Sequence, residues 1–197
     1  MTDRYTLEFS EFAAAAKRLR CRVPLIQAVA EVESAGSGFL NNGKVRVLFE
    51  GHQFWRYTGG HYARSHPTLC HKKWTSENYS KGKTADIRGA GELVRLTLAM
   101  ELDQVAALMS ASYGLFQVMG FNFALCGYTS VETFYENMCF SADRQLYAFC
   151  EYIKSTGLDD EIRNEMWDDF AYKYNGPGYL KNRYAEKLRK AVIRFDQ

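Results

Sequence analysis

Hydrophobic residues recur with a helical period along most of the chain. From residue 23 to residue 33 they follow the spacing i, i+3, i+4, i+7, at Leu25, Ala28, Val29 and Val32. Pro24 stands near the start of this segment, where the missing amide hydrogen of proline costs nothing, and Gly36 follows it, as glycine often follows a helix. The pattern predicts a helix that begins at Val23 and buries one stripe.

The same period predicts helices elsewhere in the chain. An alanine-rich apolar segment favours a helix over residues 6–19. Further helices are expected over 93–109 with a break near Asp103, from Ser130 to Gly157, from Asp159 or Asp160 to Tyr174, and over 179–195. Ser130 and one of the two aspartates are expected to cap their helices, and the Gly-Pro-Gly at 176–178 to stop one.

A change of period indicates one short β-element. Asn41-Asn42-Gly43 is a turn signal, and the apolar residues Val45, Val47 and Phe49 then alternate with their neighbours up to Glu50. We expect a strand here, within a small β-element over residues 44–57. Residues 59–90 show no period and predict an irregular lobe or long loop. The fold class is therefore mainly α (α+β), in a single domain over residues 1–197.

Composition narrows the possible functions. Apolar residues make up 47% of the 197, which suits one domain with a sizeable core. Aromatic residues make up 15%, a proportion that suits a carbohydrate groove because flat rings stack on sugar faces. A net charge of +2 is too small to indicate nucleic-acid binding. We expect a monomer without a cofactor.

The cysteines and the N-terminus bear on where the protein is made. Five cysteines, an odd number without a CxxC motif, argue against a disulfide framework and for buried thiols in a reducing cytosol. The N-terminus has no signal-peptide architecture, and no apolar run approaches about 18 residues. We therefore expect no membrane-spanning helix, and another agent must release the protein if its substrate lies outside the cell.

Charge is concentrated in two segments near the C-terminus. Residues 181–194 contain six basic residues and one acid, and residues 159–169 contain six acids and one basic residue. Two neighbouring helices of complementary charge explain this distribution. A basic face that is attracted to an anionic bacterial envelope is the alternative.

Glu33 is the first candidate for chemistry. It stands where the helical pattern from Val23 meets a glycine-rich turn, so its carboxyl group is expected at the edge of a cleft. A half-buried carboxylic acid held rigidly there keeps its proton and can protonate a glycosidic oxygen. Glu50 follows 17 residues later, at the end of the expected strand, and is the candidate for a second carboxylate.

Three blocks of sequence, at 29–54, 111–120 and 170–177, resemble the phage endolysin N-acetylmuramidase domain family over residues 22–195. They are more distantly similar to goose-type lysozymes and lytic transglycosylases. The resemblance implies a lysozyme-like helical domain with a small β-hairpin lobe beside the catalytic cleft. It also implies cleavage of the β-1,4 bond between N-acetylmuramic acid and N-acetylglucosamine in bacterial peptidoglycan, and synthesis in the host cytoplasm followed by holin-dependent release.

The resemblance also assigns residues by position. It implies that Glu33 is the catalytic acid and Glu50 the second carboxylate. The residues that it implies for substrate binding are Ser112, Tyr113, Gly114, Gln117, Tyr174, Asn175, His52 and Tyr57. Many members of the family carry a separate peptidoglycan-binding domain, and with only about 20 residues before the match we expect none here.

Three alternatives stay open. If the C6 hydroxyl of muramic acid attacks instead of water, the enzyme is a lytic transglycosylase. A metal-dependent wall amidase or peptidase would use the histidine cluster, but the spacings of 9, 5 and 5 residues match no usual ligand pattern, so we expect no metal. These histidines are His52, His61, His66 and His71. A non-catalytic glycan-binding module is the third alternative.

Overall fold

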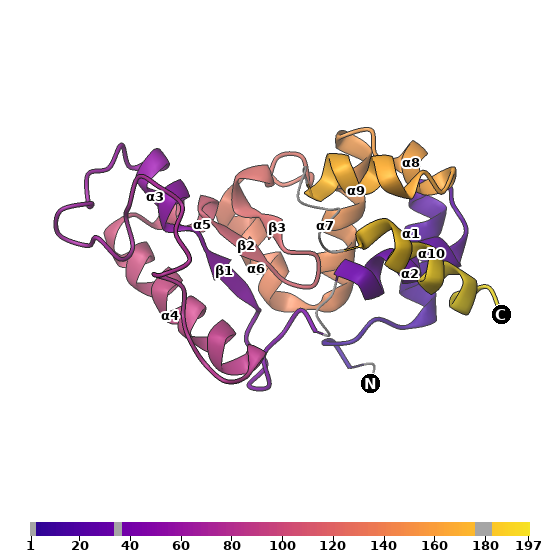
Figure 1. The fold of residues 1–197 in the computed structure, drawn as a ribbon, viewed down its shortest axis with the longest axis horizontal. Helices are drawn as coiled ribbons and strands as arrows, with labels where there is room; N and C mark the ends of the chain where they lie inside the picture. The colour runs from indigo at the N-terminus through magenta and orange to yellow at the C-terminus, as the bar shows by residue number, and fades with distance from the viewer. Residues whose placement is uncertain (1–2, 34–36, 176–182) are drawn as a thin grey trace.

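The computed structural model describes residues 3–33, 37–175 and 183–197, with only the backbone of Asn175. Most of this chain is helical, with a small antiparallel sheet, as predicted (Figure 1). The elements are α1 (Phe9–Leu19), α2 (Val23–Glu33), β1 (Val47–Phe49), α3 (Gly51–Tyr57), α4 (Ala85–Leu102), α5 (Gln104–Met109), β2 (Ala111–Tyr113), β3 (Val118–Met119), the 3-10 helix η1 (Gly120–Asn122), α6 (Val131–Phe140), α7 (Ala142–Ser155), α8 (Asp159–Arg163), α9 (Trp167–Asn175) and α10 (Tyr184–Phe195).

The elements form two parts on either side of the sheet. Helices α1, α2 and α7–α10 gather at one end, and α3, α4 and the irregular segment 58–84 make up the other end, which we call the lobe (residues 50–102) (Figure 1). Helix α2 packs against both α1 and α10. Its predicted stripe is buried at Leu25, Ala28 and Val29. The helix that ends at Glu33 is therefore held by apolar contacts on more than one side.

The sheet differs from the predicted β-element. Its order is β1-β2-β3, with Val47 opposite Tyr113 and Ser112 opposite Met119. The prediction over 44–57 was right for β1 and wrong for residues 51–57, which form α3. Strands β2 and β3 were not predicted. All three residues of β2 are buried, so the strand is covered on both faces, and three residues are too few to show a strand period.

Helix α4 begins at Ala85, eight residues earlier than predicted. Two glycines hide this start because glycine lowers helix propensity. Both admit a close neighbour: a Cβ on Gly89 would lie 2.6 Å from Leu40 Cδ2, and a Cβ on Gly91 would lie 1.8 Å from Ser80 Oγ. The predicted break at Asp103 is confirmed, since its side chain accepts a hydrogen bond from the Ala106 amide and caps α5.

The C-terminal helices are shorter than predicted. The prediction of one helix from residue 159 to Tyr174 was wrong: α8 and α9 are separated at residues 164–166, where Glu165 has a φ of 55°. The N-cap residue of α8 is Leu158, so the predicted cap by an aspartate was wrong. Asp159 and Asp160 lie in the first turn of α8, and both pair with Arg163. Ser130 does cap α6, as predicted. The predicted end signals at Gly36 and at 176–178, and the predicted helix start at 179, lie outside the described residues.

Three further features complete the description of the fold. The five cysteines are free thiols, and Cys70, Cys126 and Cys150 are buried. Among the helices that the structure describes, none is long and apolar enough to cross a membrane. The predicted complementarity of the C-terminal charges is seen as an ion pair between Arg189 of α10 and Asp168 of α9.

Candidate active site

Glu33 ends α2 and lines a cavity of about 190 Å³. The residue is half-buried, and its Oε1 atom is shielded from solvent. The other residues that line the cavity are Phe116, Gln117, Val118, Met119, Asn122, Tyr152 and Tyr174. The cavity thus brings together Glu33, Gln117 and Tyr174, one residue from each of the three sequence blocks.

Tyr174 forms the wall of the cavity on α9. Its hydroxyl donates a hydrogen bond of 3.1 Å to the Phe116 carbonyl, and its ring stacks on Phe170 with centroids 5.4 Å apart. Burial raises the pKa of Tyr174 well above its ordinary value, and a negative charge on Glu33 raises it further. The phenol is therefore a neutral donor, held in one orientation next to Glu33.

Gln117 shapes the turn between β2 and β3. Its backbone is left-handed, with φ 49°, and Gly114 in the same turn has φ 71°. Its Oε1 atom accepts from the Ser112 hydroxyl at 2.9 Å, and its Nε2 atom donates to the Gly114 carbonyl at 2.8 Å. Ser112 and Gly114 are thus tied to Gln117 and do not line the cavity. The Tyr113 side chain is buried in the core, so this residue can offer only its backbone.

Gln145 was not among the predicted site residues, yet it anchors this turn. Its Oε1 atom accepts from the Leu115 amide at 2.7 Å, and its Nε2 atom donates to the Met138 carbonyl at 2.7 Å. A Cβ on Gly38 would lie 2.0 Å from this Oε1 atom, and one on Gly114 would lie 2.4 Å from Cδ. The sequence signal that could have identified Gln145 is its polar side chain among the apolar residues that α7 buries.

Glu50 follows β1 and belongs to a different environment. Its Oε2 atom accepts a hydrogen bond from the Tyr79 hydroxyl and lies 3.3 Å from His52 Nδ1. His52, which the resemblance implies for substrate binding, thus lies next to Glu50. Tyr79 was not predicted, because it lies in the irregular segment. Burial raises the pKa of Tyr79, and the hydrogen bond to Glu50 raises it further.

The sheet relates Glu50 to the Glu33 cavity, but the two carboxylates do not share that cavity. Leu48 lies opposite Ser112, and Ser112 lies opposite Met119, which lines the Glu33 cavity. The extended backbone of Glu50 continues the alternation of β1, so its side chain shares the face of Leu48. Two strand spacings of about 4.8 Å put β1 and β3 roughly 10 Å apart. Glu50 is not among the residues that line the cavity.

Tyr57 and Asn175 complete the predicted binding residues. The Tyr57 ring lies 6.5 Å from the ring of Phe121, which precedes the cavity residue Asn122. Tyr57, a residue of the lobe, therefore lies next to η1, which carries the cavity residue Asn122. Asn175 ends α9, and its side chain lies outside the described residues.

The four histidines have separate surroundings. Within the described residues, no group of three or more His, Cys, Asp or Glu side chains is placed to hold a metal ion. His71 Nδ1 lies 2.8 Å from the Lys73 carbonyl, and the His61 ring packs edge-on against Tyr62. His66 Nδ1 lies 3.0 Å from the Ser65 hydroxyl. Each ring thus has a neighbour of its own, and only His52 contacts a candidate site residue.

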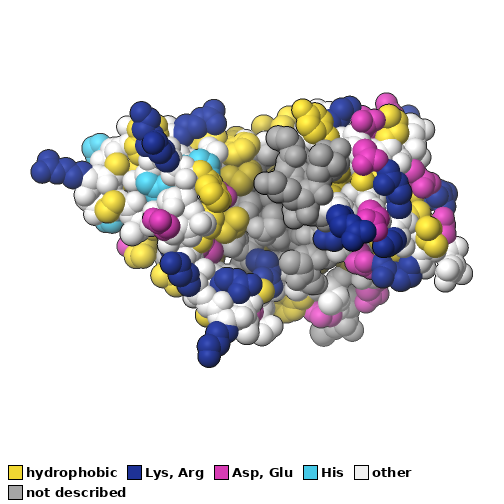
Figure 2. Space-filling view, viewed as in Figure 1, with side chains coloured by type: hydrophobic (Ala, Val, Ile, Leu, Met, Phe, Trp, Pro, Cys, Tyr) yellow, Lys and Arg dark blue, Asp and Glu magenta, His cyan; other side chains and the backbone are white. Residues whose placement is uncertain are grey.

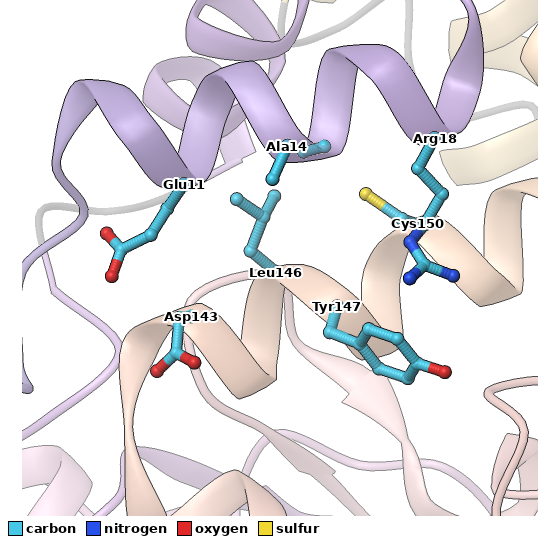
Figure 3. Close-up of a pocket in the computed structure, with 8 residues that line it drawn as sticks. Glu11, Ala14, Arg18, Asp143, Leu146, Tyr147 and Cys150 are labelled. Atoms are coloured by element: carbon cyan, nitrogen blue, oxygen red, sulfur yellow. The ribbon is translucent and has the colours of Figure 1, made fainter.

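A larger groove of about 230 Å³ lies between α1 and α7 (Figure 3). Leu146 and Ala14 face each other across it, and the Arg18 guanidinium lies over the Tyr147 ring at 4.5 Å. Its one thiol, Cys150, is unreactive because burial raises its pKa to about 12. The groove contains none of the predicted site residues.

Comparison with known proteins gives matches of two kinds. The family model for N-acetylmuramidases matches residues 22–196. The crystal structure of the Burkholderia AP3 phage endolysin is similar, with a TM-score of 0.87 and 33% sequence identity; the alignment covers 100% of this chain and 74% of that chain. A search of curated proteins found no match.

Proposed function

The chain belongs to the N-acetylmuramidase family, and we propose that it is an endolysin that cleaves the β-1,4 bond between N-acetylmuramic acid and N-acetylglucosamine. The similarity to a phage endolysin supports the biological role. The observation that carries the chemistry is the cavity in which Glu33 meets Gln117 and Tyr174.

Glu33 acts as the general acid in this proposal. Its carboxyl group lies at the C-terminal end of α2, with Oε1 shielded from solvent, at the wall of the cavity that would bind the glycan. Its proton passes to the glycosidic oxygen as the bond to the sugar breaks. Because α2 is packed on both sides, the acid keeps its position during the reaction.

Water completes the reaction in this proposal. Glu50 does not line the cavity, so it is poorly placed to attack a sugar bound there. In this proposal it instead accepts a proton from a water molecule that attacks the sugar from the side opposite Glu33. The product is then a free reducing end. A lytic transglycosylase would instead form a 1,6-anhydro end and would need no such water.

The test of the acid is Glu33→Gln, with Glu31→Gln as the matched control. Both residues lie on α2, but Glu31 is exposed and pairs with Arg194. Glu33→Gln should lower turnover of purified peptidoglycan at least ~1,000-fold while leaving the circular dichroism spectrum and melting temperature near wild type, because only the transferable proton is lost. Glu31→Gln should retain activity. Substantial activity in folded Glu33→Gln would overturn the assignment.

A further inference from the structure

Tyr79 and His52 both contact the same oxygen of Glu50. The Tyr79 hydroxyl donates to Oε2, and His52 Nδ1 lies 3.3 Å from it. The Glu50 side chain is only 15% exposed, so a rotation of its carboxyl group would break a largely buried hydrogen bond. The hydrogen bond from Tyr79 therefore holds Oε2, and His52 Nδ1 lies close to the same oxygen.

A buried carboxylate holds Tyr79 and Glu50 next to each other. Glu92 accepts from the Ser80 amide at 2.5 Å through Oε1 and from the Phe49 amide at 3.2 Å through Oε2. Ser80 follows Tyr79, and Phe49 precedes Glu50. One side chain on α4 therefore fixes the backbone next to each partner. Arg95 pairs with Glu92 at 2.7 Å.

The Tyr79 ring is held as well. It packs edge-on against Trp74, with centroids 6.3 Å apart, and the Arg95 guanidinium lies 5.8 Å from its centroid. The raised pKa of Tyr79 keeps the phenol protonated, so it remains a donor to the carboxylate. An irregular segment of the lobe thus presents one fixed hydrogen-bond donor to Glu50.

We propose that Tyr79 is a positioning residue that sets the orientation of the Glu50 carboxylate, so that Oε1 faces the water to be activated. The proposal rests on the role of Glu50 as base in the proposed function. In the step itself, the water proton moves to Oε1 as the water oxygen bonds to the sugar, and the Tyr79 proton stays on its phenol.

The experiment compares Tyr79→Phe with Tyr62→Phe in hydrolysis of soluble glycan strands from peptidoglycan. Tyr62 is a matched control, because its hydroxyl also makes one hydrogen bond in the lobe, of 2.7 Å to the Leu102 carbonyl, without contacting Glu50. Tyr79→Phe should lower kcat about 10- to 100-fold with KM unchanged. Tyr62→Phe should keep wild-type kcat. Equal effects of the two variants on kcat would overturn the proposal.

The pH dependence gives a readout that a merely structural role does not change. Removing the Tyr79 donor leaves the ionised carboxylate less stabilised than in the wild type. Because the base must be ionised, the acidic limb of the kcat profile should move to higher pH in Tyr79→Phe and stay in place in Tyr62→Phe. An unshifted limb in both would contradict the proposal.

A double-mutant cycle with Glu50→Gln separates the possible failures. We expect Tyr79→Phe to lower kcat in the wild-type background and to have no further effect in Glu50→Gln. An equal loss in both backgrounds would refute the positioning role and leave Glu50 as base. Wild-type kcat in Glu50→Gln would refute the base and, with it, the positioning role. Neither outcome changes the Glu33 assignment, which Glu33→Gln tests separately.

Discussion

The helical part of the molecule and the lobe are stabilised in different ways. In the helical part, α2 is packed by α1 and α10 through apolar side chains, and Glu33 extends from this framework. In the lobe, the 27 residues from 58 to 84 lack regular helices and strands, and a buried Glu92–Arg95 pair ties them to β1 and α4. The proposed acid thus depends on apolar packing, and the proposed base depends on a few polar bonds.

The helical part and the lobe also differ in how many of their cations have carboxylate partners. Most described cations of the helical part have carboxylate partners, as in the pairs Arg18–Glu151 and Arg22–Asp196. In the lobe, all of whose residues the structure describes, only Arg95 among the lysines and arginines has such a partner. Figure 2 shows this contrast: dark blue and magenta groups alternate at the helical end, while the lobe shows scattered dark blue with little magenta. The lobe therefore presents unneutralised positive charge to solvent.

The largest expected difference between the two parts is in the stability lost when a buried carboxylate is neutralised. The two variants to compare are Glu92→Gln in the lobe and Glu161→Gln in the helical part. Both carboxylates are buried and paired, but the partner of Glu92 is 12% exposed, and the partner of Glu161, Lys173, is 53% exposed. Losing Glu92 leaves Arg95 buried without its partner, which should lower the free energy of unfolding by ~3–5 kcal/mol. Lys173 can turn to water, so the loss from Glu161→Gln should be smaller.

Urea unfolding measures both losses, and hydrogen exchange locates them. The amides of the lobe should lose protection in Glu92→Gln while those of α2 keep theirs. Equal destabilisation by the two variants, or uniform loss of protection, would show that the two parts are not held differently.

The smallest expected effect comes from reversing charge on the two surfaces. Lys187→Glu with Lys190→Glu on α10, and Lys81→Glu with Lys83→Glu in the lobe, change four exposed residues. Each pair should alter unfolding free energy by less than ~1 kcal/mol. Binding to isolated cell envelopes at low salt should fall more for the lobe pair, because lobe charge is not neutralised. A loss confined to the α10 pair would support the alternative that the C-terminal helix binds the envelope.

The features that the sequence predicted correctly are those encoded by residues close together in the chain. The helix that ends at Glu33 has a four-residue apolar stripe within one segment, and Asp103 and Ser130 are caps that act over three residues. Strand β2 escaped prediction because it is short and buried on both faces, and β3 escaped because it has only two residues. Gln145 and Tyr79 escaped because their partners lie 30 and 29 residues away, and no local pattern encodes such contacts.

The measurement that tests the central claim most directly is mass spectrometry of the soluble fragments released from purified peptidoglycan. Hydrolysis by Glu33 and water predicts fragments with reducible N-acetylmuramic acid ends and intact stem peptides. Anhydro-muramic ends, lighter by one water, would contradict the role of water and of Glu50. Cleaved stem peptides on intact glycan would contradict the muramidase assignment itself.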